Sequence, residues 1–258
     1  MSCVQSVALE TDRPFFPLKL QALIQLPRLA NESGVVSCRE AIELLEKLAL
    51  ELPPRPNWQR GGNITSPRDL VFRSVSKEET DEITEKYHYL RSPRQRSEGF
   101  GLFTSDGILV ALAVSSPLDV SNIAGLLKGS GRTGPPRVIS RVFVFETAPR
   151  NTISYLLAKT RFHEKSSGTS DLVTYVNPNM GFTGVSYKAS GWHVLGYEGG
   201  TRYKYLDDRY ATDRQLLARV GTDDANVLRR MIGDRFSVSV MQLMPLVIFH
   251  TPLGQSTA

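Results

Sequence analysis

Cysteine and histidine are scarce in this chain of 258 residues, and their scarcity limits the chemistry to be expected. The two cysteines, Cys3 and Cys38, cannot form a metal site alone and favour ordinary reduced thiols. The histidines, which show no recognisable metal-ligand spacing, are His88, His163, His193 and His250. No metal-binding residue is assigned from the sequence, and a metal requirement stays open.

Long apolar runs, repeats and low-complexity tracts are missing as well. No stretch approaches the roughly 18 to 20 uninterrupted apolar residues of a membrane span. The first residues, MSCVQSVALETDRPFF, lack the zones of a secretory signal. With 41% hydrophobic and 22% charged residues, we expect a soluble globular protein of the cytoplasm without a membrane partner. The length suffices for one good core and a small appendage.

Positive charge is in modest excess, with a formal net charge of +5 and a pI near 9.2. Two stretches concentrate it, namely KYHYLRSPRQR at 86–96 and LLKGSGRTGPPR at 126–137. Cations gain counterion release at phosphates while rings stack on unpaired bases, so this mixture predicts a nucleic-acid-binding surface. A solvated basic loop explains a single cluster equally well. The side chains concerned are Tyr87, His88, Tyr89, Arg91, Arg94, Arg96, Lys128, Arg132 and Arg137.

The first 65 residues differ from the rest of the chain. Ser37 and Glu40 form a capping box that opens a helix with one apolar side. The sequence LPPRPNWQRGGN, at 52–63, then breaks this helix with three prolines and two glycines. We therefore expect residues 1–65 to be a helical extension with a linker, and 66–258 to be the main domain.

The main domain shows strand and helix signals in an orderly succession. Asp106–Gly107 joins two apolar runs into a hairpin, and Ser76 with Glu79 forms a second capping box. A strand, a helix and a strand between 138 and 176 predict a right-handed parallel crossover. The expected strands are 70–75, 99–104, 108–116, 138–146 and 171–176, with a last hairpin at 192–206; the expected helices start at 77, 153, 185 and 213; the segment 241–249, interrupted by Pro245, is strand-like.

This order of elements resembles the acyl-CoA N-acyltransferase fold of the GNAT superfamily. The resemblance implies an α/β (α+β) domain with a mixed, mostly antiparallel sheet whose central parallel strands splay apart, plus the small helical N-terminal extension. An acyl donor such as acetyl-CoA would lie between the splayed strands, with its pyrophosphate on the free amides of the following helix. That helix begins at Arg150, Asn151, Thr152 and Ile153. The superfamily's usual Arg/Gln-x-x-Gly-x-Gly/Ala loop is absent, and Pro149-Arg-Asn-Thr152 stands in its place.

A narrower resemblance covers residues 87 to about 205. The succession HYL, GFGLF/LVALAV, SRVFV, PRNTISYLL and TYVNPNMGFTGVSYKASGWHVLGY resembles the phage Mom-type DNA modification proteins, a divergent GNAT branch. Their pattern runs HYS, a strand bearing Arg, Asn-x-x-Ser opening a helix, Ser-Tyr-Ala-Asp, and Gly-His-x-Gly-x-x-Tyr-x-Ala before a Gly- or Asn-aromatic pair. Two positions depart from it, because Asn177 stands for the Asp and Phe182 for the His. An amide cannot accept a proton as a carboxylate does.

The resemblance implies an enzyme that modifies adenine at the exocyclic N6 in duplex DNA. It places a carbamoylmethyl group there and so protects phage DNA from restriction, in the host cytoplasm if the gene belongs to a phage. Simple acyl transfer from a thioester would leave an N-acyl group instead. The donor therefore stays open, with acetyl-CoA as the leading candidate.

Tyr187 and Arg141 are the first two candidate catalytic residues. Tyr187 sits in the short expected helix beside the splay, where its phenol is expected to protonate a departing thiolate; a core tyrosine with a satisfied hydroxyl is the structural alternative. Arg141 lies inside an expected strand, where an unpaired cation is costly. It therefore needs a pocket, or a salt bridge to an acid such as Asp171 or Glu146.

Ser154 and Asn177 complete the candidate catalytic set. Ser154 is expected to bind phosphate or polarise the donor carbonyl, although a cap or a surface hydroxyl is equally common there. Turn formation around Pro178 explains Asn177 most simply, and N-capping explains Asn151. Because adenine N6 lies inside the base stack, the base must be flipped out, and Tyr89 and Trp192 are the candidate stacking platforms.

Three classes of function follow and stay open at this stage. The first is the DNA adenine modifier. The second is a conventional acetyl-CoA-dependent acyltransferase that acts on a small amine or a protein lysine. The third is a noncatalytic nucleic-acid-binding protein on a GNAT scaffold, for which a Tyr187→Phe variant would keep its full biological effect.

Overall fold

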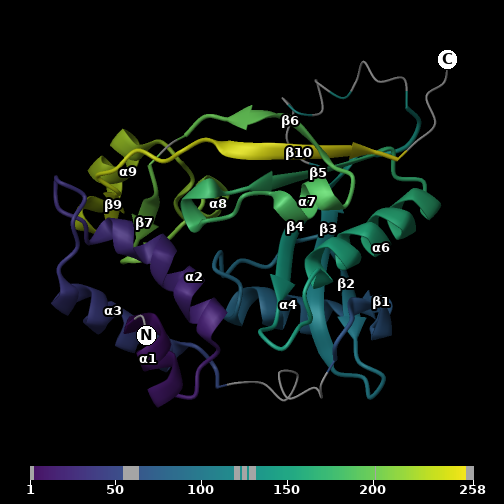
Figure 1. Cartoon of the computed structure of the whole chain (residues 1–258). Coiled ribbons are helices and arrows are strands. Elements are labelled where there is room, and N and C mark those ends of the chain that lie inside the picture. Colours follow the sequence, from purple (N-terminus) through teal and green to yellow (C-terminus); the bar gives the residue numbers. More distant parts are fainter. Residues whose placement is uncertain are drawn as a thin grey trace. The chain divides into compact units, whose positions relative to one another are not determined.

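The computed structural model describes residues 3–54, 64–118, 123, 127, 132–200 and 202–253 (Figure 1). The chain forms two compact units. The helical unit comprises Met1–Pro54, Glu85–Arg91 and Gly199–Pro245, and the sheet unit comprises Arg55–Thr84, Ser92–Glu198 and Leu246–Ala258. This division differs from the expected boundary at 65/66, because residues 199–245 group with the N-terminal helices and not with the sheet.

A seven-stranded sheet in the order β1-β2-β3-β4-β5-β10-β6 forms the sheet unit. Its neighbours pair antiparallel except for β4 and β5, which are parallel. This topology confirms the expected GNAT-like fold class. The strands are β1 (Val71–Val75), β2 (Glu98–Phe103), β3 (Leu109–Pro117), β4 (Arg137–Val144), β5 (Asp171–Val176), β6 (His193–Glu198) and β10 (Leu246–Pro252).

Local sequence signals fix the helix starts and the central hairpin. Ser76 accepts a hydrogen bond from the Glu79 amide at 3.1 Å, where α4 (Lys77–Lys86) begins. Gly107 adopts φ 86° in the turn between β2 and β3, a left-handed conformation that favours glycine. The remaining elements of the sheet unit are α6 (Thr152–Ser166), α7 (Val185–Ala189) and the 3-10 turns η3 (Pro67–Asp69) and η4 (Pro178–Met180).

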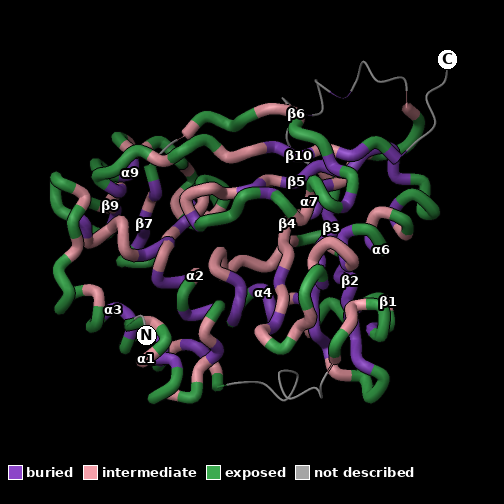
Figure 2. Tube along the Cα trace, viewed as in Figure 1, coloured by how far each residue is buried: buried purple, intermediate pink, exposed green. Residues whose placement is uncertain are grey.

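The core of the sheet unit lies on both faces of the sheet. Leu156 and Leu157 of α6 are fully buried in two apolar clusters that include Leu172 of β5 and Leu102 of β2. Figure 2 shows the buried stretches along β2 and β3, whose residues are buried almost throughout. Such runs lack the alternation of a strand with one solvated face.

The expected last hairpin at 192–206 is wrong. β6 pairs with β10, across 199–245, and β10 lies between β5 and β6 in the sheet. Residues 204–206 instead form β7 (Lys204–Leu206), which pairs with β8 (Arg209–Tyr210) and β9 (Phe236–Val238) in a separate three-stranded sheet. Pro245 does not interrupt β10, because the strand begins at the next residue. A pairing of strands this far apart in the chain leaves no local signal in the sequence.

The helical unit combines N-terminal helices with the inserted segment. Ser37 caps α3 by accepting from the Glu40 amide at 3.2 Å, as expected. The buried Tyr205 of β7 donates from its hydroxyl to the Ile24 carbonyl at 3.0 Å, which joins the insertion to the N-terminal helices. The elements are α1 (Cys3–Glu10), α2 (Phe15–Gln25), η1 (Leu26–Arg28), α3 (Cys38–Glu51), α8 (Asp213–Val220), α9 (Ala225–Ile232) and η5 (Gly233–Arg235). Among the described residues, no helix is long and apolar enough to span a bilayer.

Candidate active site at the divergence of two strands

The parallel strands β4 and β5 separate after three residue pairs. Their register runs from Arg137 opposite Leu172 to Ile139 opposite Thr174, and then ends. β4 continues to Val144 while paired only with β3, and β5 continues to Val176. The expected splay is therefore present, and beyond Ile139 one edge of β4 offers backbone groups that β5 does not use.

Hydrogen bonds mark the point where the strands part. The Thr174 hydroxyl, which is buried, donates to the Ile139 carbonyl at 2.9 Å. The Tyr187 hydroxyl lies 3.4 Å from the same Thr174 oxygen. A separation of 3.4 Å is long for a hydrogen bond between hydroxyls, so the phenol is held only weakly and can turn toward a bound molecule.

Aromatic contacts hold the ring of Tyr187 in this position. Phe249 of β10 stacks on it with ring centroids 5.6 Å apart and planes 24° apart. Trp192 meets it edge-on at 5.5 Å and 76°. Gly184, which precedes α7 with φ 72°, packs so closely on Phe249 that an added Cβ would lie 2.5 Å from its ring. Gly184 therefore allows both the backbone turn and the close packing that place Tyr187 where β4 and β5 separate.

The surroundings of Tyr187 keep its phenol protonated. Burial disfavours the phenolate and raises the pKa of Tyr187 above its ordinary value of 10.0. The hydroxyl is consequently protonated at neutral pH and suits a proton donor better than a base.

Arg141 follows Ile139, the last residue of β4 that pairs with β5, by two residues. Its side chain points to the face of the sheet opposite Tyr187. It pairs with Val114 of β3, whereas Ile139 pairs with the neighbouring Ser115, so Ser140 is an extra residue that forms a bulge. Ser115 faces α6, since Arg137 joins it to Glu164 of that helix. Arg141 thus projects away from α6, the helix beside which Tyr187 packs.

Two backbone carbonyls are among the partners of Arg141. Its guanidinium donates to the Ser140 carbonyl at 2.6 Å and to the Ser92 carbonyl at 2.9 Å. Of the two acids expected as alternative partners, Asp171 is wrong, and Glu146 stays a prediction. Asp171 instead pairs with Arg132 and with His250, each at 2.8 Å.

The start of α6, where an anion is expected to bind, presents backbone amides, and the anion site itself stays a prediction. Thr152 is buried, and its hydroxyl and amide both donate to the Pro149 carbonyl, at 2.6 and 3.3 Å. The amides of Ile153 and Ser154 lie in the first helical turn, where no intrahelical acceptor exists. The Ile153 side chain packs on the apolar cluster around Leu157, and Arg150 is exposed. A phosphate would accordingly meet two backbone amides and the exposed Arg150.

Asn151 takes the place of a glycine in the loop before α6, because its backbone adopts a conformation that usually favours glycine. It adopts φ 67° and ψ 9° at the N-cap position, a left-handed conformation that Asn tolerates better than most residues. Its side chain makes no capping bond, so the expected N-cap role of that side chain is wrong.

An Asn151 series will test this reading. We expect Asn151→Gly to keep stability and cofactor affinity, whereas Asn151→Val costs roughly 1–2 kcal/mol of unfolding free energy because a β-branched residue is strained there. Urea unfolding followed by circular dichroism measures the difference. Equal stability of both variants would contradict it.

Asn177 performs the turn role that the sequence suggested. Its side-chain oxygen accepts from the Asn179 amide at 3.0 Å and from the Asn179 side-chain nitrogen at 2.9 Å, at the start of η4. Ser154 is half-buried in the first turn of α6. Thus Tyr187 and the start of α6 pack on one apolar cluster, while Arg141 lies on the opposite face.

Most of the aromatic residues expected to stack on bases are buried. Trp192 is 2% exposed and belongs to the core around Tyr187, and Tyr87 and His88 are 4% and 5% exposed. These three rings offer no free face to a base, so the expectation is wrong for them. Tyr89 is half-buried and stacks on His88 with centroids 4.5 Å apart.

Several expected DNA-contacting cations have acidic partners instead. Arg91 pairs with Glu51 at 2.9 Å, and Arg132 pairs with Asp171. Arg94 is half-buried and Arg96 is exposed. Lys128 lies outside the described residues. Among the described cations of the expected surface, Arg96 is the one that is exposed.

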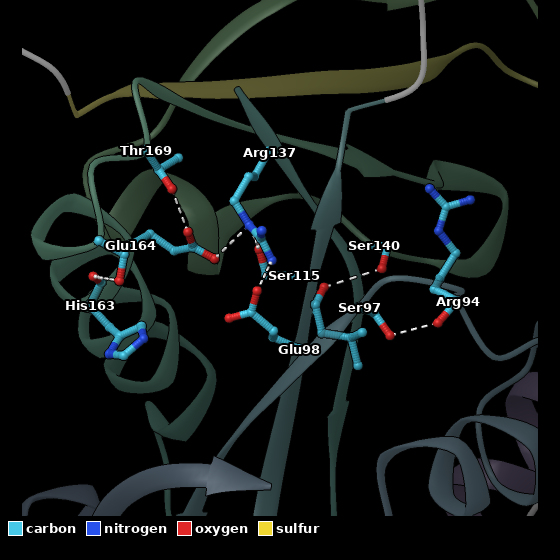
Figure 3. A network of polar contacts seen from close by, with 11 residues as sticks. Arg94, Ser97, Glu98, Ser115, Arg137, Ser140, His163, Glu164 and Thr169 are labelled. Carbon is cyan, nitrogen blue, oxygen red and sulfur yellow. Dashed lines mark hydrogen bonds and ion pairs between the residues drawn. The ribbon is translucent and has the colours of Figure 1, made fainter. Parts of the chain in front are cut away.

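A polar network that was not predicted from the sequence lies beneath α6 (Figure 3). Arg137, at the start of β4, donates to the Ser115 hydroxyl and to Glu98, each at 2.9 Å, and lies 3.2 Å from Glu164. Glu164 is 2% exposed and also accepts from the Thr169 hydroxyl at 2.6 Å. The one sequence feature that could have indicated this network is Glu164, an acid on the inward side of the helix expected from residue 153.

One cavity of the sheet unit lies apart from Tyr187. A cavity of about 230 Å³ opens beside β1 and the start of α4, and its lining includes Ser74, Lys77, Ser97 and Glu98. Within the described part of the chain, no group of three or more His, Cys, Asp or Glu side chains gathers as a metal site.

A mixed sheet with one diverging parallel pair, a partly buried tyrosine at the divergence and a helix start beyond it define a GNAT-like domain. The Mom protein family model matches residues 69–243, which is well over half of the chain. The chain belongs to the Mom protein family. No curated protein matches it in sequence.

Solved structures of acetyltransferases are similar to the chain at low identity. An N-acetyltransferase from Staphylococcus aureus Mu50 is 12% identical, with 71% of this chain and 97% of that chain covered and a TM-score of 0.40. A phosphinothricin acetyltransferase from Sinorhizobium meliloti, in complex with AcCoA, is 10% identical over 73% and 91% of the two chains, with a TM-score of 0.43. A Bacillus subtilis acetyltransferase in complex with CoA is 12% identical over 71% and 99%, with a TM-score of 0.40.

Proposed function

We propose that this protein is a group-transfer enzyme that modifies adenine N6 in duplex DNA with a carbamoylmethyl-type group and so protects phage DNA from restriction. The observation that carries the proposal is the position of the Tyr187 hydroxyl at the point where β4 and β5 part, in a chain of the Mom protein family. A flipped adenine would enter at the divergence, because N6 is inaccessible within the base stack.

An acyl-CoA donor fits the residues present. The amides of Ile153 and Ser154 supply donors for a phosphate, and the β4 edge beyond Ile139 supplies unused backbone groups. When bound, such a donor supplies a thiol leaving group, but attack of adenine N6 on its carbonyl carbon would give an N-acyl product, so the source of the carbamoylmethyl group stays open. The chain's own residues then orient the adenine amine against it and exclude water, while the Tyr187 phenol delivers a proton to the leaving group.

Mass spectrometry of nucleosides from plasmid DNA after expression tests the proposal. We expect a modified adenosine whose mass exceeds that of deoxyadenosine by a carbamoylmethyl group. An adenosine pool that stays unmodified under several growth conditions would contradict it. Acetylation of a polyamine or a lysine without DNA affinity would instead indicate a conventional acyltransferase.

A matched control distinguishes catalysis from binding. In the same assay, Tyr187→Phe tests whether the chain is a noncatalytic DNA-binding protein, because such a protein keeps its biological effect without the phenol. Protection that persists with unmodified DNA in the Tyr187→Phe strain would overturn the enzymatic assignment.

A further inference from the structure

The helices α6 and α7, with the loops beside them, expose cations but no acids. Residues 147–192, which the structure describes throughout, contain two acids, Glu164 and Asp171. Each of these acids is 2% exposed and ion-paired, so neither offsets charge at the surface. This part of the sheet unit therefore presents positive charge to solvent. Its cations are Arg150, Lys159, Arg161, Lys165 and Lys188.

The three lysines of this stretch are exposed, and no acid pairs with them among the described residues. The Lys159 ammonium lies over the Tyr155 ring, 5.3 Å from its centroid, a contact that does not neutralise its charge. Arg68 and Asp69 of η3, the turn that contacts α6, are both exposed and offset each other. The lysines are therefore available to an anionic partner.

An exposed aromatic ring lies between two of these lysines. Phe162 is 73% exposed, and Lys159 and Lys165 each stand three residues from it in α6. Because residues three apart are neighbours on a helix surface, the two lysines flank the ring. The opposite side of the helix, with Leu156 and Leu157, is buried in the core. The outward side of α6 is thus basic, aromatic and open to solvent.

This outward side adjoins the candidate site through α7, which lies beside α6 in Figure 1. The Arg161 guanidinium of α6 donates to the Ser190 carbonyl, at the end of α7, at 2.9 Å. A Cβ added to Gly191 would lie 2.6 Å from the same guanidinium, so the two helices are joined closely here. The helix α7 carries Tyr187 and, as the next residue, Lys188. A duplex held along α6 and Lys188 would therefore lie beside Tyr187.

Two simpler explanations account for only part of this surface. Lys165 and Lys188 lie in the last turns of their helices, where a cation is favourable. Helix polarity does not explain the exposed Phe162, or Lys159 in the middle of α6. A donor phosphate at the start of α6 does not reach Lys165, which lies about 16 Å along the helix axis from Ser154. Duplex DNA carries phosphates over that whole length.

We infer that the outward side of α6, together with Lys188 of α7, binds duplex DNA beside the candidate site. Lys159, Lys165 and Lys188 contact backbone phosphates, and Phe162 packs on the sugars between them. This inference rests on the proposed function. Phosphate contacts gain free energy from counterion release and carry no sequence information, so the surface positions the duplex without selecting its sequence.

Binding of duplex DNA to the full-length protein, measured by fluorescence anisotropy over a series of salt concentrations, tests the inference. For the triple variant Lys159→Gln/Lys165→Gln/Lys188→Gln we expect Kd to rise about 10²-fold at physiological salt. The slope of log Kd against log salt should fall by about 2.7, because about 0.9 counterion is released per phosphate contact. Phe162→Ala should raise Kd about fivefold with the slope unchanged, since an apolar contact releases no counterion.

A matched control removes the same charge from the helical unit. The triple variant Lys19→Gln/Arg39→Gln/Lys47→Gln replaces three exposed cations of α2 and α3. It should leave the slope unchanged and change Kd by less than about threefold, because every inferred phosphate contact is kept. Both triple variants retain Arg150, which is expected to bind the donor phosphate, and Arg161, which holds α7.

The outcomes separate this inference from the proposed function. If the wild type binds DNA but the α6/α7 triple variant keeps its Kd and slope, the inference is overturned, whether or not adenine is modified. If the wild type binds DNA through these lysines but no modified adenosine is found by mass spectrometry, only the proposed function fails. Binding of the wild type to vesicles that contain phosphatidylserine, without binding to duplex DNA, would assign the surface to a membrane and overturn the inference. If the triple variant does not fold, the three single lysine variants decide, and an unchanged slope in all three overturns it.

Discussion

Replacing Tyr187 with Phe is expected to lower kcat for adenine modification by about 10²- to 10⁴-fold, the range typical of a lost general acid. The stability of the fold should change by less than about 1 kcal/mol, because Phe keeps the contacts with Phe249 and Trp192 and loses only a weak hydroxyl contact. Single-turnover measurement of modified adenosine, together with urea unfolding, checks both parts. A variant with full activity would show that Tyr187 is a packing residue.

Tyr175 is the matched control for this substitution. It follows Thr174 in β5, so its side chain lies on the opposite face of the strand. Burial, together with Glu198, raises the pKa of Tyr175 to about 12, so its phenol is also protonated at neutral pH. Tyr175→Phe should retain activity, because a protonated phenol that lies away from the divergence of β4 and β5 cannot donate its proton to the leaving group.

The pH dependence separates two roles for Tyr187. Its raised pKa keeps the phenol protonated below about pH 10, so an acid role predicts that Tyr187 contributes no change in kcat between about pH 7 and 9. A base role would require the phenolate, and kcat would then rise about tenfold per pH unit over the same range. Comparison of wild type with Tyr187→Phe isolates this contribution from that of other groups.

Local signals in the sequence predicted the central elements of the sheet unit well. The capping residues Ser37 and Ser76, the turn at Asp106–Gly107 and the crossover from β4 through α6 to β5 all have short-range physical causes. The splay of β4 from β5 was expected from the family resemblance and is confirmed by their register. Structure with a local cause in the sequence was therefore accessible.

Pairings between distant segments were not predicted from the sequence. The strand β10 carries its own apolar signal, but nothing local shows that it lies between β5 and β6. Cations raise the same difficulty, because Arg91 and Arg132 read as free charges until Glu51 and Asp171 are seen beside them. Charge along a sequence thus overstates the charge of a surface wherever the fold supplies a partner.

Arg137→Met is expected to destabilise the sheet unit by about 3–5 kcal/mol. The substitution leaves Glu164, which is 2% exposed, as a buried carboxylate with only the Thr169 hydroxyl as its observed neutral partner. Removal of one member of a buried ion pair costs more than the pair contributes, because the remaining charge stays desolvated. Urea unfolding of the full chain followed by circular dichroism measures the loss.

Compensating and control variants show whether burial of charge is the cause. Glu98→Gln removes the other partner of Arg137, but the Glu98 side chain is 59% exposed, so the expected cost is about 0–1 kcal/mol. Arg137→Met combined with Glu164→Leu replaces the buried pair with apolar groups and should recover most of the stability. If the double variant were as unstable as Arg137→Met alone, the loss would come from packing around β4 and not from an unpaired Glu164. The strand β4 begins at Arg137 and diverges from β5 after Ile139. If the double variant recovered both stability and activity, the polar network would support the site only by holding β4 in register.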